Sequence, residues 1–360
     1  MKTSPNIFDS DLPPLVPHGG NLGDAVRRYG IARERWIDLS TGINPHGYPV
    51  PAVAQQAWLR LPDDEDDLET IAALHYGSPR ALAMAGTQAA IRLLPEVLPK
   101  GPVGVGLLTY GEYAPAFARA GFDVARFVTG PFADRQGQAA FVLEPGHALP
   151  ENLKHLVLVN PNNPTTERFS PDVVMDWYRQ LAARGGTLVV DEAFVEALPE
   201  LSVASRADGE GLVVLRSIGK FFGLAGARVG FVLASAPIDR AMRRLRGPWS
   251  VSGPARVVVR AALLDAAWQT ETRARLADAS KRLAELLGAS GLEASHTPLF
   301  AWVRQPNALQ WQDCLARQGI WVRRFETVAG LRVGLPAFDE AAWSRLEAAL
   351  RNVRSEIDGR

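Results

Sequence analysis

Lys220 lies in the segment SIGKFFGLAGARVG, between a short apolar run and a glycine-rich one, with Arg228 eight residues further on. A lysine beside two phenylalanines is costly to bury unless its amine is neutral or covalently bonded. An amine of that kind can attack a carbonyl group and hold it as a Schiff base. The ordinary alternative is a solvated lysine at the start of a helix. The rest of the chain has to decide between these two interpretations.

Three further segments carry groups that could act together with this lysine. VVDEAF places Asp191 at the end of an apolar run, where a carboxylate is costly unless a cation or a strong donor meets it. NPNNPT supplies Asn163 in a turn, and AGTQ supplies Gly86, Thr87 and Gln88 at the expected start of a helix. Free backbone N–H groups and the helix dipole suit a phosphate at such a start.

Short β-rich runs position these groups. HLVLVNPNNP, TLVVDEAF and GLVVLRSIGK are apolar throughout and end in polar residues, and helical segments such as PDVVMDWYRQLAARG separate some of them. This pattern predicts an α/β fold with a mostly parallel sheet covered on both faces. Ligands of such sheets bind outside the carboxyl ends of the strands, where these polar residues lie.

The chain divides into three expected parts. Residues 1–45 form an arm rich in Pro and Gly and the start of a small domain, residues 46–245 a large domain, and residues 246–360 a small α+β domain. The acidic run PDDEDDLETI is expected to begin a helix, since carboxylates there complement the helix dipole, and not to bind a metal.

The amino-acid composition argues against several classes of function. Lys and Arg number 39 and equal the 39 Asp and Glu, so no overall field favours nucleic acid or an anionic membrane. Cys314 is the single cysteine, which rules out an internal disulfide and a thiolate zinc site, and no metal is expected. Neither a membrane span nor a secretory signal is apparent in the sequence, so we expect a cytoplasmic protein.

The order of these motifs resembles one enzyme family. NPNNPT, DEAF, and SxxK with an arginine eight residues on resemble the pyridoxal-phosphate enzymes of fold type I, the aspartate aminotransferase class, over residues 36–335. The resemblance implies a large domain with a seven-stranded, mostly parallel sheet between helices, a smaller α+β domain, and a homodimer.

The resemblance also implies a role for each motif. Lys220 would hold the cofactor, pyridoxal 5′-phosphate, as a Schiff base, and Asp191 would keep the ring nitrogen protonated. Asn163 would donate to the phenolic oxygen of the ring. Tyr110 would stack on the ring, with Tyr113 as the alternative. The residues implied to bind the cofactor are Gly86, Thr87, Gln88, Tyr110, Asn163, Asp191, Ser217, Lys220 and Arg228.

Two positions depart from the family pattern. Phe194 lies where the family usually has a tyrosine, three residues after the aspartate, so one donor to the phenolic oxygen is lost. Leu61 lies in LPDD, where enzymes near histidinol-phosphate aminotransferase often have the tyrosine of a YPD segment. That tyrosine reaches the cofactor phosphate of the neighbouring subunit.

The N-terminal segment points to a reaction within the class. HGGNLGDAVRRYG followed by WIDLSTGINPHGYP resembles the threonine-phosphate decarboxylase group of cobalamin biosynthesis. The resemblance implies a small phosphorylated amino acid as substrate, L-threonine O-3-phosphate, converted to (R)-1-amino-2-propanol O-phosphate. The residues implied to bind it are His18, Gly19, Asn44, Asn163, Arg323 for a phosphate, and Arg332 for the α-carboxylate.

Two other functions stay open. One is an aminotransferase of the same fold that acts on histidinol phosphate or an aromatic amino acid. The other is a cofactor-sensing transcription regulator. Such regulators carry a DNA-reading domain ahead of the fold. About 35 residues precede the family block here, which we expect to be too few for such a domain, and the net charge of the chain is balanced rather than basic.

Overall fold

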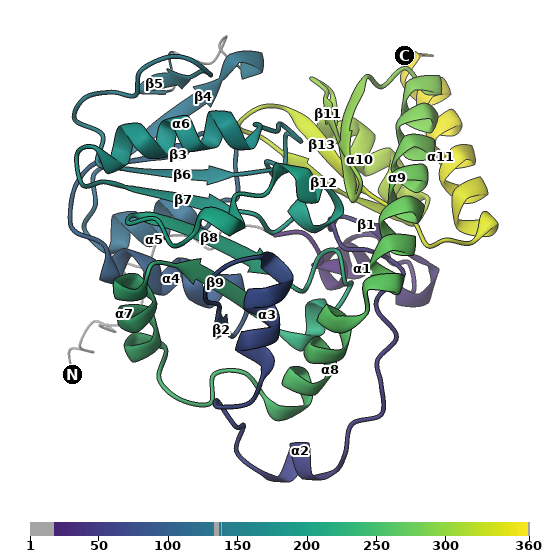
Figure 1. Cartoon of the computed structure of the whole chain (residues 1–360). Coiled ribbons are helices and arrows are strands. Elements are labelled where there is room, and N and C mark those ends of the chain that lie inside the picture. The colour runs from purple at the N-terminus through teal and green to yellow at the C-terminus, as the bar shows by residue number, and fades with distance from the viewer. Residues whose placement is uncertain (1–17, 133–136, 138, 359–360) are drawn as a thin grey trace, which may run out of the picture.

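The computed structural model describes residues 18–132, 137 and 139–358. Residues 1–17 of the expected N-terminal part lie outside the described residues. Two β-sheets lie beside one another with helices around them (Figure 1). None of the helices in the described ranges combines the length and apolar character needed to cross a membrane.

The larger sheet has eight strands, one more than expected. In spatial order they are β2 (Leu82–Met84), β9 (Gly230–Ala234), β8 (Leu212–Ser217), β7 (Thr187–Asp191), β6 (His155–Val159), β3 (Val103–Gly106), β4 (Val124–Thr129) and β5 (Phe141–Leu143). The extra strand is β5, a short edge strand that pairs in parallel with β4. Of these described strands only β9 runs opposite to the rest, so the predicted mostly parallel α/β sheet is confirmed.

Alternation along the strands places apolar side chains on both faces of this sheet. Val157, Val189 and Val213 belong to the core on one face, and their neighbours Leu188 and Leu212 belong to the core on the other. The helices that contribute to the first core are α4 (Thr87–Val97), α5 (Tyr113–Arg119) and α7 (Ala236–Arg246). Those that contribute to the second include α3 (Leu68–Tyr76), α6 (Pro171–Ala182) and α8 (Gly253–Leu264). A sheet buried on both faces needs strands that are apolar throughout, as observed here.

The smaller sheet has five strands of mixed direction. Its spatial order is β1 (Ile37–Leu39), β12 (Ile320–Phe325), β13 (Gly330–Gly334), β11 (Phe300–Arg304) and β10 (Ala294–Thr297). The helices that pack near it are α9 (Ala266–Ala289), α10 (Ala308–Arg317), α11 (Glu340–Asp358) and α1 (Leu22–Tyr29). Cys314 is buried within α10.

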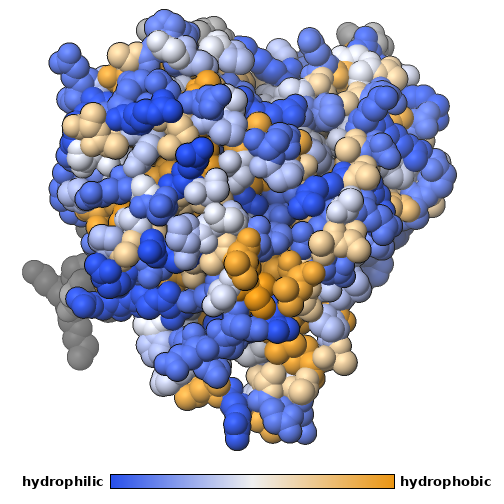
Figure 2. All heavy atoms as spheres, viewed as in Figure 1, coloured by the Kyte–Doolittle hydropathy of each residue, from blue (hydrophilic) through white to orange (hydrophobic). Residues whose placement is uncertain are grey.

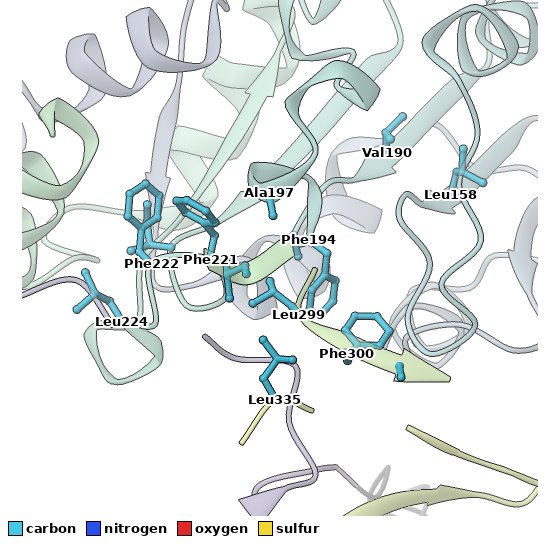
Figure 3. Close-up of a cluster of buried hydrophobic side chains, with 14 of the residues drawn as sticks. Leu158, Val190, Phe194, Ala197, Phe221, Phe222, Leu224, Leu299, Phe300 and Leu335 are labelled. Carbon is cyan, nitrogen blue, oxygen red and sulfur yellow. The ribbon is translucent and has the colours of Figure 1, made fainter. Parts of the chain in front are cut away.

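One hydrophobic core joins the two sheets. Phe194, which follows β7, packs edge-on against Phe300 of β11 with ring centroids 5.0 Å apart. Figure 3 shows these two rings together with Leu299, while Leu335 approaches from the end of β13. The shared core keeps the carboxyl ends of the large sheet facing β12 and β13. The domain boundaries at 45 and 245 stay a prediction.

The acidic run leads into α3 (Leu68–Tyr76), as expected, and it has a further role that the sequence did not predict. Asp66 accepts the backbone N–H of Leu68, but its main partner is the buried Arg256 of α8. Asp64 bonds to Arg246 at the end of α7. The run therefore ties α3 to α7 and α8 through ion pairs, in addition to preceding the helix.

A buried ion-pair network braces the two strands that carry the expected catalytic groups. Arg216 of β8 donates to Glu192 at 2.7 Å and to Glu196 at 2.5 Å, and all three side chains are nearly inaccessible. Burial acts to raise the pKa of Glu196, but Arg216 and His75 outweigh it and hold that pKa at about 2. Glu192 directly follows Asp191, so the network holds the end of β7 against β8.

We expect Arg216→Met to lower the free energy of unfolding by about 3–5 kcal/mol, because it leaves the buried Glu192 without its cation and removes the main cation of Glu196. Denaturant titration followed by circular dichroism measures the change. The matched control is Arg351→Met, which removes an exposed pair with Glu347 within one helix and should cost under about 1 kcal/mol. Equal costs for the two variants would contradict the bracing role.

Candidate functional site

The expected site residues meet at one edge of the larger sheet. Lys220 follows β8, Asp191 ends β7 and Asn163 follows β6. Tyr110 follows β3, and Gly86 follows β2. A cleft of about 1340 Å³ lies at this edge, and Lys220, Asn163 and Tyr110 line it, whereas Asp191 and Gly86 are not among its lining residues. The expected residues that line it are Lys220, Asn163, Tyr110, Arg228, His18, Gly19, Arg323 and Arg332.

Burial makes the Lys220 amine easy to deprotonate. Burial first, then the positive charges of Arg332 and Arg228, lower the pKa of Lys220 to about 8, although Asp191 opposes them. The apolar contact of the amine comes from Phe194, whose ring centroid lies 5.5 Å from Nζ. Phe221 and Phe222, the two phenylalanines that follow the lysine, lie in the hydrophobic core (Figure 3). Both rings pack against Trp268. The substitution of the family's tyrosine therefore places an apolar ring beside the amine.

Asp191 is a buried carboxylate with two donors. Its Oδ1 accepts the backbone N–H of Ala193 at 2.9 Å, and its Oδ2 accepts the hydroxyl of Tyr113 at 2.7 Å. Burial raises the pKa of Asp191, while these two hydrogen bonds and Lys220 oppose the rise. Such a carboxylate is suited to face a cationic ring nitrogen.

Gly86 and Arg228 form a cradle suited to a phosphate. Gly86 has φ +75° and precedes α4, so the first N–H groups of that helix are free of helical partners. A Cβ at Gly86 would lie 2.9 Å from an Nη of Arg228, so any side chain there would displace the guanidinium. A Cβ at Gly230 would lie 2.7 Å from the backbone nitrogen of Thr87. Ser217 ends β8 beside Gly230 in the paired strand.

A chain of polar contacts runs from the N-terminal segment to this cradle. His18 Nε2 lies 2.7 Å from one oxygen of Glu112, and the other oxygen accepts from Gln88 at 2.6 Å. The Gln88 carbonyl accepts the hydroxyl of Tyr110 at 3.0 Å. His18 therefore contacts a carboxylate that the sequence did not single out.

Two arginines face each other across the strands at the far wall of the cleft. Arg332 of β13 is paired in register with Arg323 of β12. Arg332 donates to the Asn163 side-chain oxygen and to the Ser40 carbonyl, both at 2.5 Å. Its buried Nε has no hydrogen-bond partner among the described residues. Burial, then the charge of Arg323, lowers the pKa of Arg332 to about 10, and like charges directly opposite favour a bound anion.

Asn44 makes structural contacts that the sequence did not predict. Its side-chain nitrogen donates to the Phe221 carbonyl at 2.8 Å, its oxygen accepts from His46, and its backbone N–H bonds to the Lys220 carbonyl. Asn44 is therefore a buried brace under the lysine segment, and its role in binding a substrate stays a prediction. Gly19 does line the cleft, and a Cβ there would lie only 2.1 Å from the Ser40 carbonyl oxygen, so a side chain does not fit at this position.

Sequence reasoning missed Glu112 and the contact of Tyr113 with Asp191. Both lie in LTYGEY, the segment chosen for Tyr110. The three-residue spacing of the two tyrosines was a signal, but the helix start at Tyr113, which turns that side chain under Asp191, was not visible in the sequence.

These groups fit pyridoxal phosphate: an amine of lowered pKa, a buried carboxylate, and an arginine beside a glycine at a helix start. The chain belongs to the family of class I and II aminotransferases, which matches residues 34–350. Pyridoxal phosphate is the cofactor of that family.

Individual relatives within the family indicate a more specific activity than the family does. The chain is 46% identical to a threonine-phosphate decarboxylase of Pseudomonas aeruginosa, over 93% of this chain and 97% of that one. It is 42% identical to a threonine-phosphate decarboxylase of a Sinorhizobium species, over 94% and 98%. A solved structure of histidinol-phosphate aminotransferase from Sinorhizobium meliloti, in complex with pyridoxal-5′-phosphate, superposes with a TM-score of 0.76 at 21% identity and covers 96% of each chain. That likeness shows the fold alone.

We expect Lys220→Met to stabilise the cofactor-free protein at pH 7, by at most about 3 kcal/mol, because the folded state no longer buries an ammonium. The pKa of Lys220 falls from 10.5 to about 8 on folding, so the cost is fully present below pH 8 and fades as the pH approaches 10.5. Denaturant titrations at pH 7, 9 and 10.5 measure the difference between variant and wild type. A difference that does not change with pH would show that the amine is not desolvated.

Proposed function

We propose that this protein decarboxylates L-threonine O-3-phosphate to (R)-1-amino-2-propanol O-phosphate in cobalamin biosynthesis, with pyridoxal phosphate as cofactor. The substrate class rests on one observation, the opposed Arg323 and Arg332 that face Lys220 across the cleft. Two arginines call for a substrate with two anionic groups, such as a phosphate and a carboxylate. The reaction type is supported by similarity to threonine-phosphate decarboxylases along nearly their whole length.

The cofactor, when bound, supplies a carbonyl carbon for the substrate amine and a cationic ring that takes up the electrons of a bond broken at Cα. Lys220 would hold it covalently, and Asp191 would face its ring nitrogen. Gly86, Thr87 and Arg228 would hold its phosphate. Asn163 would donate to the phenolic oxygen of the ring. Arg332 holds its amide oxygen and leaves the amide nitrogen as a donor.

The choice of the broken bond depends on how the arginines hold the substrate. Only the bond perpendicular to the cofactor ring breaks readily, so the carboxylate must be turned out of the ring plane. Arg332 is fixed by Asn163 and Ser40 and has its Nε left for an acceptor. Arg323 would bind the second anionic group and fix the remaining torsion, with His18 at the mouth of the cleft.

Lys220 would complete the reaction. Carbon dioxide leaves Cα, and the electron pair left behind is protonated at that carbon. The Nζ of Lys220 can supply this proton, since a pKa of about 8 lets the amine both hold and release a proton near neutral pH.

We expect the holoenzyme to release one carbon dioxide per L-threonine phosphate consumed, without a keto acid and with a catalytic amount of cofactor. Radiolabelled carbon dioxide and mass spectrometry of the amine measure this. Arg323→Gln should raise the KM at least tenfold, because one charge-assisted contact to the substrate is lost. Accumulation of the pyridoxamine form until 2-oxoglutarate is added would contradict the proposal and identify an aminotransferase, with histidinol phosphate as the next substrate to test.

We also infer a homodimer. Trp58 and Leu59 of α2 (Gln56–Leu59) and the nearby Leu61 are each about two-thirds exposed or more. Figure 1 shows α2 projecting from the body on a long loop, and Figure 2 shows apolar surface in the region of α3 and α8. Apolar side chains of this size support an interface, and a second copy is the partner that the family implies.

We expect a mass near twice 39.0 kDa by sedimentation equilibrium for the wild type, and a monomer for Trp58→Glu with Leu59→Glu, because buried carboxylates would disrupt the interface. The control is Leu309→Glu, which changes another exposed leucine, on α10. A wild-type monomer at every concentration tested would contradict the inference. The cytoplasmic location stays a prediction.

A further inference from the structure

The hydrogen bond between Tyr113 and Asp191 has no role in the reaction as proposed above. The hydroxyl of Tyr113 donates to Asp191 Oδ2 at 2.7 Å, and the backbone N–H of Ala193 donates to Oδ1 at 2.9 Å. Each carboxylate oxygen therefore has a donor. Together the two donors fix the plane of the carboxylate and leave one lone pair of each oxygen for a further partner.

Asp191 needs these donors to remain ionised. It is only 4% exposed, and burial raises its pKa. A protonated carboxyl group would lose the negative charge that favours a cation on the ring nitrogen. Donors to the carboxylate oppose protonation, and the Tyr113 hydroxyl has the largest opposing effect.

Tyr113 is held so that it cannot turn away. Its side chain is fully buried at the first position of α5, in the same core as Phe117. Its ring packs edge-on against Tyr110, with centroids 6.3 Å apart. Burial, then Asp191, raises the pKa of Tyr113 well above its ordinary value, so the hydroxyl keeps its proton and stays a donor.

We propose that Tyr113 is a positioning residue that keeps Asp191 ionised and aimed at the ring nitrogen of the cofactor. The inference rests on the proposed function, since it concerns the same bound cofactor. Two tyrosines of the segment LTYGEY would then act on the cofactor ring. Tyr110 would stack on the ring, and Tyr113 would act through Asp191. The charged or titratable groups around Asp191 are Tyr113 and Tyr110 from the α5 segment and Lys220 from the segment after β8.

The test uses Tyr113→Phe, which removes the hydroxyl and keeps the ring. We expect the affinity of the apoenzyme for pyridoxal phosphate to fall about tenfold to a hundredfold, because a buried carboxylate loses a donor. With cofactor labelled by ¹⁵N in the ring, the nitrogen resonance should move toward that of neutral pyridine, since the more basic Asp191 takes the proton. The kcat should fall while the KM for substrate changes little, because Tyr113 does not line the cleft.

A double-mutant cycle separates this role from a structural one. In an Asp191→Asn background the change Tyr113→Phe should add less than about twofold to the loss of cofactor affinity. The matched control is Tyr29→Phe, which removes a comparable bond, 2.9 Å from the hydroxyl to Asp313, between α1 and α10. It should leave the cofactor affinity and the nitrogen resonance unchanged.

Two failures are distinguishable. A wild type that releases carbon dioxide, with Tyr113→Phe unchanged in cofactor affinity and nitrogen resonance, would overturn the role of Tyr113 alone. A wild type that does not take up pyridoxal phosphate would overturn the proposed function and this inference together.

Discussion

Burial of charge at the ends of β7 and β8 is the constraint on which the site depends. Asp191 and Lys220 lie at neighbouring strand ends, in surroundings that disfavour their charged forms. The packing behind the two groups sets their protonation: Phe194 lies beside the amine, Tyr113 donates to the carboxylate, and the Arg216 network joins the strands. Desolvation costs are large, so small changes in these supports alter protonation more than they alter shape.

The opposite wall of the cleft brings two charges of the same sign together. The smaller sheet places Arg323 and Arg332 side by side across paired strands, and nothing in the register separates their charges. Arg332 is held by hydrogen bonds to Asn163 and Ser40, and two like charges this close favour a bound anion. The residues expected to hold the cofactor and the two arginines of the smaller sheet come together because one core, through Phe194 and Phe300, joins the two sheets.

Polar contacts also connect the N-terminal segment to the cofactor cradle. His18, Glu112, Gln88 and Tyr110 form one hydrogen-bonded chain from the mouth of the cleft to the start of α4. The segment HGG therefore lies beside groups expected to contact the cofactor, as well as beside the substrate space. Gly19 permits this approach because a side chain there would meet the Ser40 carbonyl.

Local sequence was enough to predict the parallel sheet and the residues at its strand ends. Lys220, Asp191, Asn163 and Gly86 lie in segments whose strand and turn signals are local, so their common edge follows from the topology of parallel strands. Side-chain partners were not predictable in the same way. The inward packing of Phe221, the use of Asn44 as a brace and the bond between Tyr113 and Asp191 each join segments distant along the chain. The sequence by itself determined which groups could do the chemistry, and only tertiary packing decided how each is solvated and paired, because desolvation and hydrogen bonding depend on neighbours that the folded chain brings together.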